Sequence, residues 1–165
     1  QTNPKTGFAL TQHRETREEV EFTLDLNDFS LTGKMDRLVL MPTSEKKPEW
    51  MILDYKTHHV VTEEEIQNLS EQFRFQMACY ALAVSRQFKQ ANVTAHILFT
   101  AVPTLHTLTF SAQNLETFAT DLQNHYRGLK KDVLASSFAL TTNQHCCRGC
   151  AYYQDNDCGI RSTLS

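Results

Sequence analysis

Two aspartates and a lysine are the residues whose types and spacing could carry chemistry. Asp36 lies in a segment with the alternation of a strand, and Asp54 and Lys56 lie two residues apart in the next such segment. Because side chains alternate between the faces of a strand, Asp54 and Lys56 share one face. Two carboxylates around a hard cation, with an ammonium group nearby, suit phosphodiester hydrolysis. The metal polarises the phosphate and activates water, and the lysine orients that water or stabilises the developing charge.

The Asp-x-Lys spacing is a short pattern, and it marks an ion pair at the edge of a sheet more often than a catalytic site. Its context changes this interpretation. The apolar run from Trp50 to Leu53 leads directly into Asp54, where an unpaired carboxylate is costly. A hairpin across residues 42–48 would place the Asp36 strand alongside, so that both carboxylates converge on one point.

Three polar residues at helical spacing form a second group. Gln72, Gln76 and Tyr80 recur every four residues and therefore share one stripe of a helix. Alone, Tyr80 is more typical of a core and Gln76 of a solvated face. Together, behind the Asp-x-Lys strand, they are interpreted as polar groups that point into the same site.

These residues need a sheet and a covering helix to bring them together, and hydrophobic periodicity predicts both. Thr62, followed by three glutamates, indicates a helix start, and an apolar stripe continues this helix to about Phe88. The predicted strands are Val20–Leu26, Phe29–Met41, Trp50–Thr57, Val93–Val102 and Leu105–Phe110, and a second helix runs from about residue 112 to Leu134. Strict alternation would place Leu31, Gly33, Met35, Arg37 and Val39 on one face. This order predicts an α/β fold with a mixed central sheet flanked by helices.

Composition limits the class of protein. The chain has 165 residues, of which 41% are hydrophobic, enough for one domain with a real core. A formal net charge of -3 argues against a domain that holds nucleic acid by bulk positive charge alone. The sequence shows no signal peptide and no apolar run long enough to span a membrane, so a cytoplasmic location is expected.

Three motifs in this order resemble a known family. They are Gly-Lys-Met-Asp-Arg (33–37), Leu-Asp-Tyr-Lys-Thr (53–57) and Gln-Met-Ala-Cys-Tyr (76–80). They look like the RecB-like branch of the PD-(D/E)XK nucleases, which provides the nuclease domain of helicase-nucleases of the RecBCD and AddAB type. The resemblance covers roughly Val20 to Tyr80, and it implies a restriction-endonuclease-like core.

The same resemblance implies roles for individual residues. Asp36, Asp54 and the backbone carbonyl of Tyr55 would bind Mg²⁺ or Mn²⁺. Lys56 would be catalytic. The Gln-x-x-x-Tyr pair, Gln76 and Tyr80, would lie near the site and the DNA backbone.

The chain departs from the family at one point. The family carries a histidine on a helix well before the Gly-x-x-Asp-Arg strand, and His13 lies too close to that strand, in a segment without helical periodicity, to match. We therefore expect residues 1–16 to be a lead-in, residues 17–140 to be a nuclease core without its N-terminal helix, and residues 141–165 to be a cysteine-rich tail. Such a fragment would be weak or inactive by itself.

Four of the five cysteines lie in the tail: Cys146, Cys147, Cys150 and Cys158, beside His145. This clustering is more typical of a metal site than of disulfides, and zinc, an iron–sulfur cluster and free thiols are all compatible with the spacing. Some RecB-like nucleases have a similar tail, in which three C-terminal cysteines and one upstream bind a 4Fe-4S cluster. That resemblance implies Cys147, Cys150 and Cys158 as ligands, with Cys146 as a spare candidate. Cys79, inside the long helix, is expected to be a buried apolar residue.

The expected function is that of a Mg²⁺-dependent deoxyribonuclease, with exonuclease action favoured over endonuclease action. The resemblance implies the C-terminal nuclease module of an ATP-dependent helicase-nuclease in DNA repair and recombination, with DNA and a helicase domain or subunit as partners. Two alternatives are a nuclease fold that binds DNA without cutting it and a structural interaction domain built around the tail. Intact Asp36, Asp54 and Lys56 favour the enzyme, because a decayed site would not keep these charges.

Overall fold

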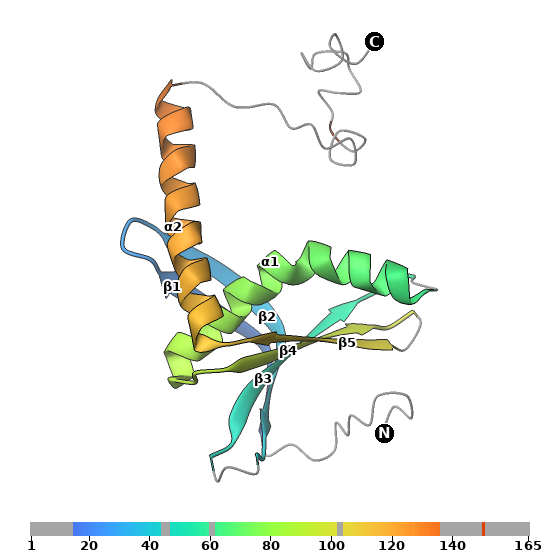
Figure 1. Ribbon diagram of the computed structural model, residues 1–165. Helices are drawn as coiled ribbons and strands as arrows, with labels where there is room; N and C mark the ends of the chain where they lie inside the picture. The colour runs from blue at the N-terminus through green and yellow to red at the C-terminus, as the bar shows by residue number, and fades with distance from the viewer. Residues whose placement is uncertain (1–14, 44–46, 60–61, 102–103, 136–149, 151–165) are drawn as a thin grey trace, which may run out of the picture. The chain divides into compact units, whose positions relative to one another are not determined.

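A computed structural model describes residues 15–43, 47–59, 62–101, 104–135 and 150. It confirms the predicted α/β fold, a mixed five-stranded sheet with flanking helices (Figure 1). In chain order the elements are β1 (Glu15–Asp25), β2 (Ser30–Met41), β3 (Glu49–Lys56), α1 (Glu63–Phe88), β4 (Val93–Phe99), β5 (Thr104–Phe110) and α2 (Ala112–Ala135). The largest difference from the predicted bounds is the start of β1.

The strands lie in the sheet in their chain order, β1-β2-β3-β4-β5. β3 and β4 are parallel, and every other neighbouring pair is antiparallel. A parallel pair needs a long crossover connection, which α1 provides. In this strand order β3 is the middle strand. Its last residues lie beside the end of β4, with Asp54 opposite Ile97 and Lys56 opposite Phe99.

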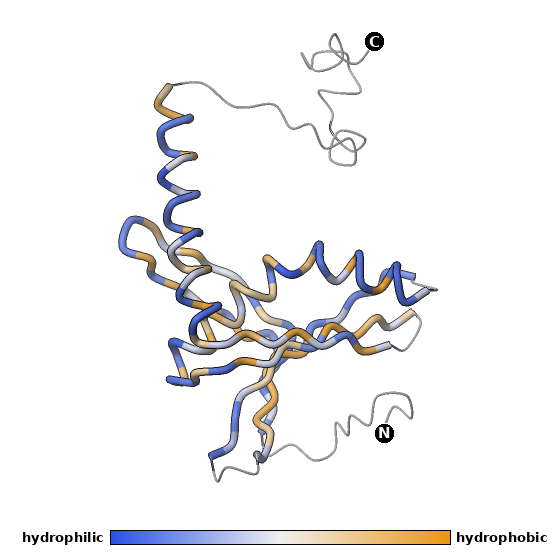
Figure 2. The backbone as a smooth tube through the Cα atoms, in the orientation of Figure 1, coloured by the Kyte–Doolittle hydropathy of each residue, from blue (hydrophilic) through white to orange (hydrophobic). Residues whose placement is uncertain are grey.

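The helix α1 begins as the sequence predicts. The hydroxyl of Thr62 accepts the backbone N–H of Glu65, and the side chain of Glu65 accepts the backbone N–H of Thr62, which completes a capping box. The first half of the helix is largely hydrophilic (Figure 2), and the second half is buried continuously from Met77 to Val84. Gln76 stands at the boundary between these halves, so its side chain can reach a polar site next to the core.

The core lies between the sheet and the helices. Its largest fully buried side chains come mostly from the central strands and α1, including Ile52, Leu82, Ile97 and Phe99. Cys79 is buried as predicted, and burial raises the pKa of its thiol to about 11. This thiol therefore behaves as a small apolar group at neutral pH.

The predicted start of β1 at Val20 is wrong, because the strand begins at Glu15. Residues 15–19 are all polar and carry no alternation of apolar side chains. They are held by pairing with β2 and by ion pairs across it, Glu18 with Arg37 and Glu19 with Lys34. A strand stabilised by cross-strand charge pairs has no hydrophobic signature for the sequence to reveal.

The alternation expected along β2 holds from Ser30 to Met35 and breaks after it. Met35 and Leu38 are both fully buried in the core although they lie three positions apart. Arg37 is instead stacked 5.7 Å from the ring centroid of Tyr55. On the neighbouring strand Glu19 has a φ of 54°, in the left-handed region. Both strands are thus irregular near Asp36: β2 loses its alternation after Met35, and β1 has a left-handed residue at Glu19.

The chain divides into two compact units with a boundary between Gln123 and Asn124. The first contains the sheet, α1 and the first half of α2, whose Leu115, Ala119 and Leu122 join the core. Residues 124–135 and Cys150 belong to the second unit. Among the described helices, none is long and apolar enough to cross a membrane.

The predicted metal ligands of the tail cannot be placed as a group. Cys146, Cys147 and Cys158 lie outside the described residues. Cys150 is described, as a half-buried free thiol.

We expect His96 of β4 to make the stability of the fold depend on pH. Its side chain is buried, with Nδ1 2.8 Å from the hydroxyl oxygen of Thr107, and burial lowers its pKa from 6.5 to about 4. As the pH falls below 6.5, the unfolded chain takes up a proton that the folded chain does not. The free energy of unfolding should therefore fall by about 1.4 kcal/mol per pH unit, or about 2 kcal/mol between pH 7 and pH 5.

The measurement is urea-induced unfolding at both pH values, for the wild type and His96→Gln. Glutamine keeps a polar side chain beside Thr107 but does not titrate. The His96→Gln protein should therefore lose about 2 kcal/mol less stability between pH 7 and pH 5 than the wild type. Equal losses in the two proteins would contradict the role of His96.

Candidate active site

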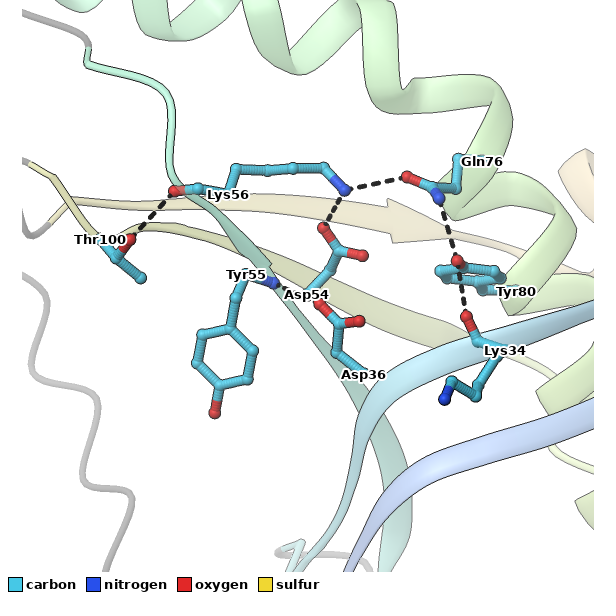
Figure 3. A network of polar contacts seen from close by, with 8 residues as sticks. All are labelled: Lys34, Asp36, Asp54, Tyr55, Lys56, Gln76, Tyr80 and Thr100. Atoms are coloured by element: carbon cyan, nitrogen blue, oxygen red, sulfur yellow. Dashed lines mark hydrogen bonds and ion pairs between the residues drawn. The ribbon is translucent and has the colours of Figure 1, made fainter.

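The site begins where the ladder between β2 and β3 ends. The last paired residues are Arg37 and Leu53, and one further step in this register would set Asp36 opposite Asp54. Oδ2 of Asp36 accepts the backbone N–H of Tyr55 at 2.9 Å. The side chain of Asp36 thus takes an N–H at the edge where the backbone pairing stops, and this bond anchors its carboxylate beside that of Asp54 (Figure 3).

Asp54 is a buried carboxylate with the cation of Lys56 close beside it. Its exposed fraction is 1%, and Nζ of Lys56 lies 2.7 Å from its Oδ2. That oxygen accepts no hydrogen bond of regular geometry from a described residue, so the ion pair is its main compensation for burial. Burial raises the pKa of Asp54, the charge of Asp36 adds to this effect, and Lys56 opposes it. Two carboxylates and one ammonium leave one net negative charge, which favours a further cation.

Lys56 is held by α1 as well as by its own strand. Its side chain is 14% exposed, and Nζ donates a hydrogen bond to Oε1 of Gln76 at 3.1 Å. Its backbone carbonyl accepts the N–H of Thr100 at 2.9 Å, just beyond the end of β4. The last residue of β3 is therefore fixed at both its main chain and its ammonium group.

Gln76 and Tyr80 continue this network into β2. Nε2 of Gln76 donates to the hydroxyl of Tyr80 at 2.9 Å, and that hydroxyl donates to the backbone carbonyl of Lys34 at 2.8 Å (Figure 3). The directions follow from chemistry, because an ammonium has no acceptor and a backbone carbonyl has no donor. Burial is the main cause that raises the pKa of Tyr80, which keeps its hydroxyl a donor. One chain of hydrogen bonds thus joins β3, α1 and β2.

The structure brings together five of the predicted site residues, Asp36, Asp54, Lys56, Gln76 and Tyr80, and it places the backbone of Tyr55 among them. Gln72, which shares their helical spacing, is exposed on α1 and has no described hydrogen bond to this network. Gln72 lies in the hydrophilic first half of the helix, before α1 reaches the core, so the periodicity alone extends the polar stripe too far.

Three further groups contact the site residues and were not predicted from the sequence. The carbonyl of Lys34 and the backbone N–H of Thr100 contribute through the main chain, which has no signal in the residue type. Phe73 lies with its ring centroid 4.4 Å from Nζ of Lys56. Its position three residues before Gln76, on the same side of a helix, was the available signal, but an aromatic residue in an apolar stripe is normally core.

Gly33 is required by the packing that positions Tyr80. A Cβ added at Gly33 would lie 2.7 Å from the ring of Phe22, which pairs with it across β1 and β2. That ring makes an edge-to-face contact with Tyr80, at 5.6 Å between centroids. Gly33 therefore leaves room for the Phe22 ring to lie close to β2 and to contact the tyrosine whose hydroxyl bonds to Lys34.

Gly33→Ala should consequently lower stability and loosen the site together. The added methyl group must push the Phe22 ring towards Tyr80, and such overpacking typically costs about 1 to 3 kcal/mol. Thermal unfolding measures this loss. Gly128→Ala is the matched control and should not lose stability, because among the described residues an added Cβ there meets nothing within 4 Å apart from its own stretch of helix. A Gly33→Ala protein as stable as the wild type would contradict this account.

The residues at this site fit a hard divalent cation. Among the residues that the structure describes, no three His, Cys, Asp or Glu side chains gather into a metal site, so Asp36 and Asp54 would be the only carboxylates. Mg²⁺ is commonly bound through one or two carboxylates while it keeps several waters. The buried charge of Asp54, only partly offset by Lys56, supplies the electrostatic reason for a cation to bind.

A family model described as the PD-(D/E)XK nuclease superfamily matches residues 4–154, most of the chain. This match identifies the superfamily and does not distinguish its RecB-like branch from the others. No curated protein matches the chain.

Proposed function

Since this chain belongs to the PD-(D/E)XK nuclease superfamily, we propose that it hydrolyses phosphodiester bonds of DNA with a Mg²⁺ or Mn²⁺ ion held by Asp36 and Asp54. The observation that carries the proposal is the buried Asp54 with Lys56 on one side and Asp36 on the other. A structural ion pair would need one carboxylate for one ammonium, and this site has a second carboxylate.

Each residue of the site has its own role in the proposed hydrolysis. A water oxygen forms a bond to phosphorus, one P–O bond of the phosphodiester breaks, and the leaving oxygen takes up a proton. A bound cation would polarise the phosphate and make water a better nucleophile. Lys56 presents its ammonium to the same point, where it can orient the water or stabilise charge that develops on the phosphate. Gln76 and Tyr80 fix the direction of that ammonium through hydrogen bonds that run to Lys34 of β2.

The test is cleavage of end-labelled linear and circular DNA by the purified intact protein that contains this chain. Cleavage should require Mg²⁺ or Mn²⁺, stop when EDTA is added and return when the cation is restored. Cleavage of linear but not circular DNA would support exonuclease action, which is part of the proposal. DNA binding without cleavage in either cation would favour the alternative of a nuclease fold that binds but does not cut.

The wider context is proposed on the three motifs alone. We propose that the chain is the nuclease module of a RecB-like helicase-nuclease that acts in cytoplasmic DNA repair and recombination, with a helicase domain or subunit as its partner. The tail cysteines Cys147, Cys150 and Cys158, with Cys146 as a spare, are proposed to bind an iron–sulfur cluster or zinc in the intact protein. Iron, sulfide and zinc analysis of protein purified without oxygen distinguishes these two centres from free thiols.

A further inference from the structure

The ammonium group of Lys56 is surrounded by three different kinds of contact. Oδ2 of Asp54 lies 2.7 Å away, Oε1 of Gln76 lies 3.1 Å away, and the ring centroid of Phe73 lies 4.4 Å away. The first is a charge pair, the second a hydrogen bond, and the third a cation–π contact, in which the negative face of the ring attracts the cation. The side chain of Lys56 is only 14% exposed, and a cation–π contact strengthens when water is excluded.

The contact with Phe73 is built into the helix. Phe73 lies one turn before Gln76 on α1, so both side chains project from the same side of the helix. Its ring also contacts that of His58, at 5.5 Å between centroids, just beyond the end of β3. Phe73 is therefore held between α1 and the chain that leaves β3, with its ring against the ammonium.

The three contacts would not respond alike to a bound cation. A divalent ion at Asp54 competes with Lys56 for the same carboxylate and weakens their ion pair. Gln76 and Phe73 are not carboxylates, and their hold on the ammonium does not depend on that oxygen. A lysine side chain has four rotatable bonds, and it would lose its position if one hydrogen bond alone restrained it.

We propose that Phe73 is a positioning residue, whose ring face keeps the Lys56 ammonium aimed at the phosphate while a cation occupies Asp54. The inference rests on the proposed nuclease function and adds a residue to its machinery. It predicts that an aromatic face is required at position 73, and that apolar bulk alone is insufficient.

Two substitutions separate the ring face from the bulk. Phe73→Leu keeps an apolar side chain but removes the aromatic face, and kcat at saturating cation should fall about ten-fold while KM for DNA changes little. Phe73→Tyr keeps the face and should stay within about two-fold of the wild type. Phe75→Leu is the matched control: it makes the same change at the next aromatic residue of α1, which is 58% exposed and outside the site. In a Lys56→Met background, Phe73→Leu should have no further effect.

A second measurement needs no catalysis. A ring at this distance shifts the ε-methylene proton resonances of Lys56 upfield, and the Lys56 signal is identified by its loss in Lys56→Arg. The shift should be present in the wild type and Phe73→Tyr, and absent in Phe73→Leu. A wild-type signal without the shift, or a folded Phe73→Leu with unchanged kcat, would overturn the proposal. If the wild type cleaves no DNA with either cation, the nuclease function fails, and the resonance shift still decides whether Phe73 holds the ammonium.

Discussion

Lys56→Met should lower Mg²⁺-dependent DNA cleavage by roughly 10²-fold or more, while DNA binding stays largely intact. Methionine keeps most of the length and apolar volume of the lysine stem but removes the ammonium that lies between Asp54 and Gln76. The charge that develops on the phosphate then has no partner from this side chain. The measurement is the single-turnover cleavage rate at saturating Mg²⁺, together with the affinity for DNA.

Lys131→Met, on an exposed turn of α2, is the matched control and should cleave at the wild-type rate. Circular dichroism must show that Lys56→Met is folded, because the substitution leaves Asp54 buried without its ammonium. A folded Lys56→Met protein that cuts at the wild-type rate would move the chemistry away from this strand.

Asp54→Asn should lower cleavage by a similar factor, again roughly 10²-fold or more, for a different reason. Asparagine has almost the same shape as aspartate but carries no charge, so it cannot compensate the charge of a divalent cation. Isothermal titration with Mn²⁺ should therefore show a large loss of affinity. Lys56→Met should instead keep its Mn²⁺ affinity or increase it, because no ammonium then competes for Oδ2 of Asp54.

This difference between the two variants separates cation binding from the stabilisation of charge on the phosphate. Asp121→Asn, an exposed aspartate on α2, is the control for a loss of one negative charge. Unchanged Mn²⁺ affinity in Asp54→Asn would contradict the assignment of Asp54 as a ligand, even if cleavage were lost.

The order of elements could be predicted because each has a local signature. The capping box at Thr62 and the buried run of β3 are properties of neighbouring residues in the chain, and the structure confirms both. The start of β1 could not be predicted, because its first residues pair through the backbone and through Glu18 and Glu19 with charges on β2. Those partners lie 15 and 19 positions away in the sequence.

The candidate site shows the same division. Alternation along one strand determined that Asp54 and Lys56 share a face, and helical spacing determined that Gln76 and Tyr80 share another. Only the tertiary structure decided that Gln76 accepts a hydrogen bond from Lys56 and that Asp36 takes the N–H of Tyr55. These contacts depend on the crossover by which α1 passes over the sheet and on where the β2–β3 ladder stops.

Residue types and periodicity thus determined which groups could do chemistry, because these are local properties of the chain. The tertiary structure decided what each group contacts. It places Phe73, an ordinary member of an apolar stripe, next to the ammonium of Lys56. It also places Gly33 against the ring of Phe22, which contacts Tyr80. The physical reason is that burial and contact between distant segments set the strength of electrostatic and aromatic interactions, and no local pattern encodes which distant segment will arrive.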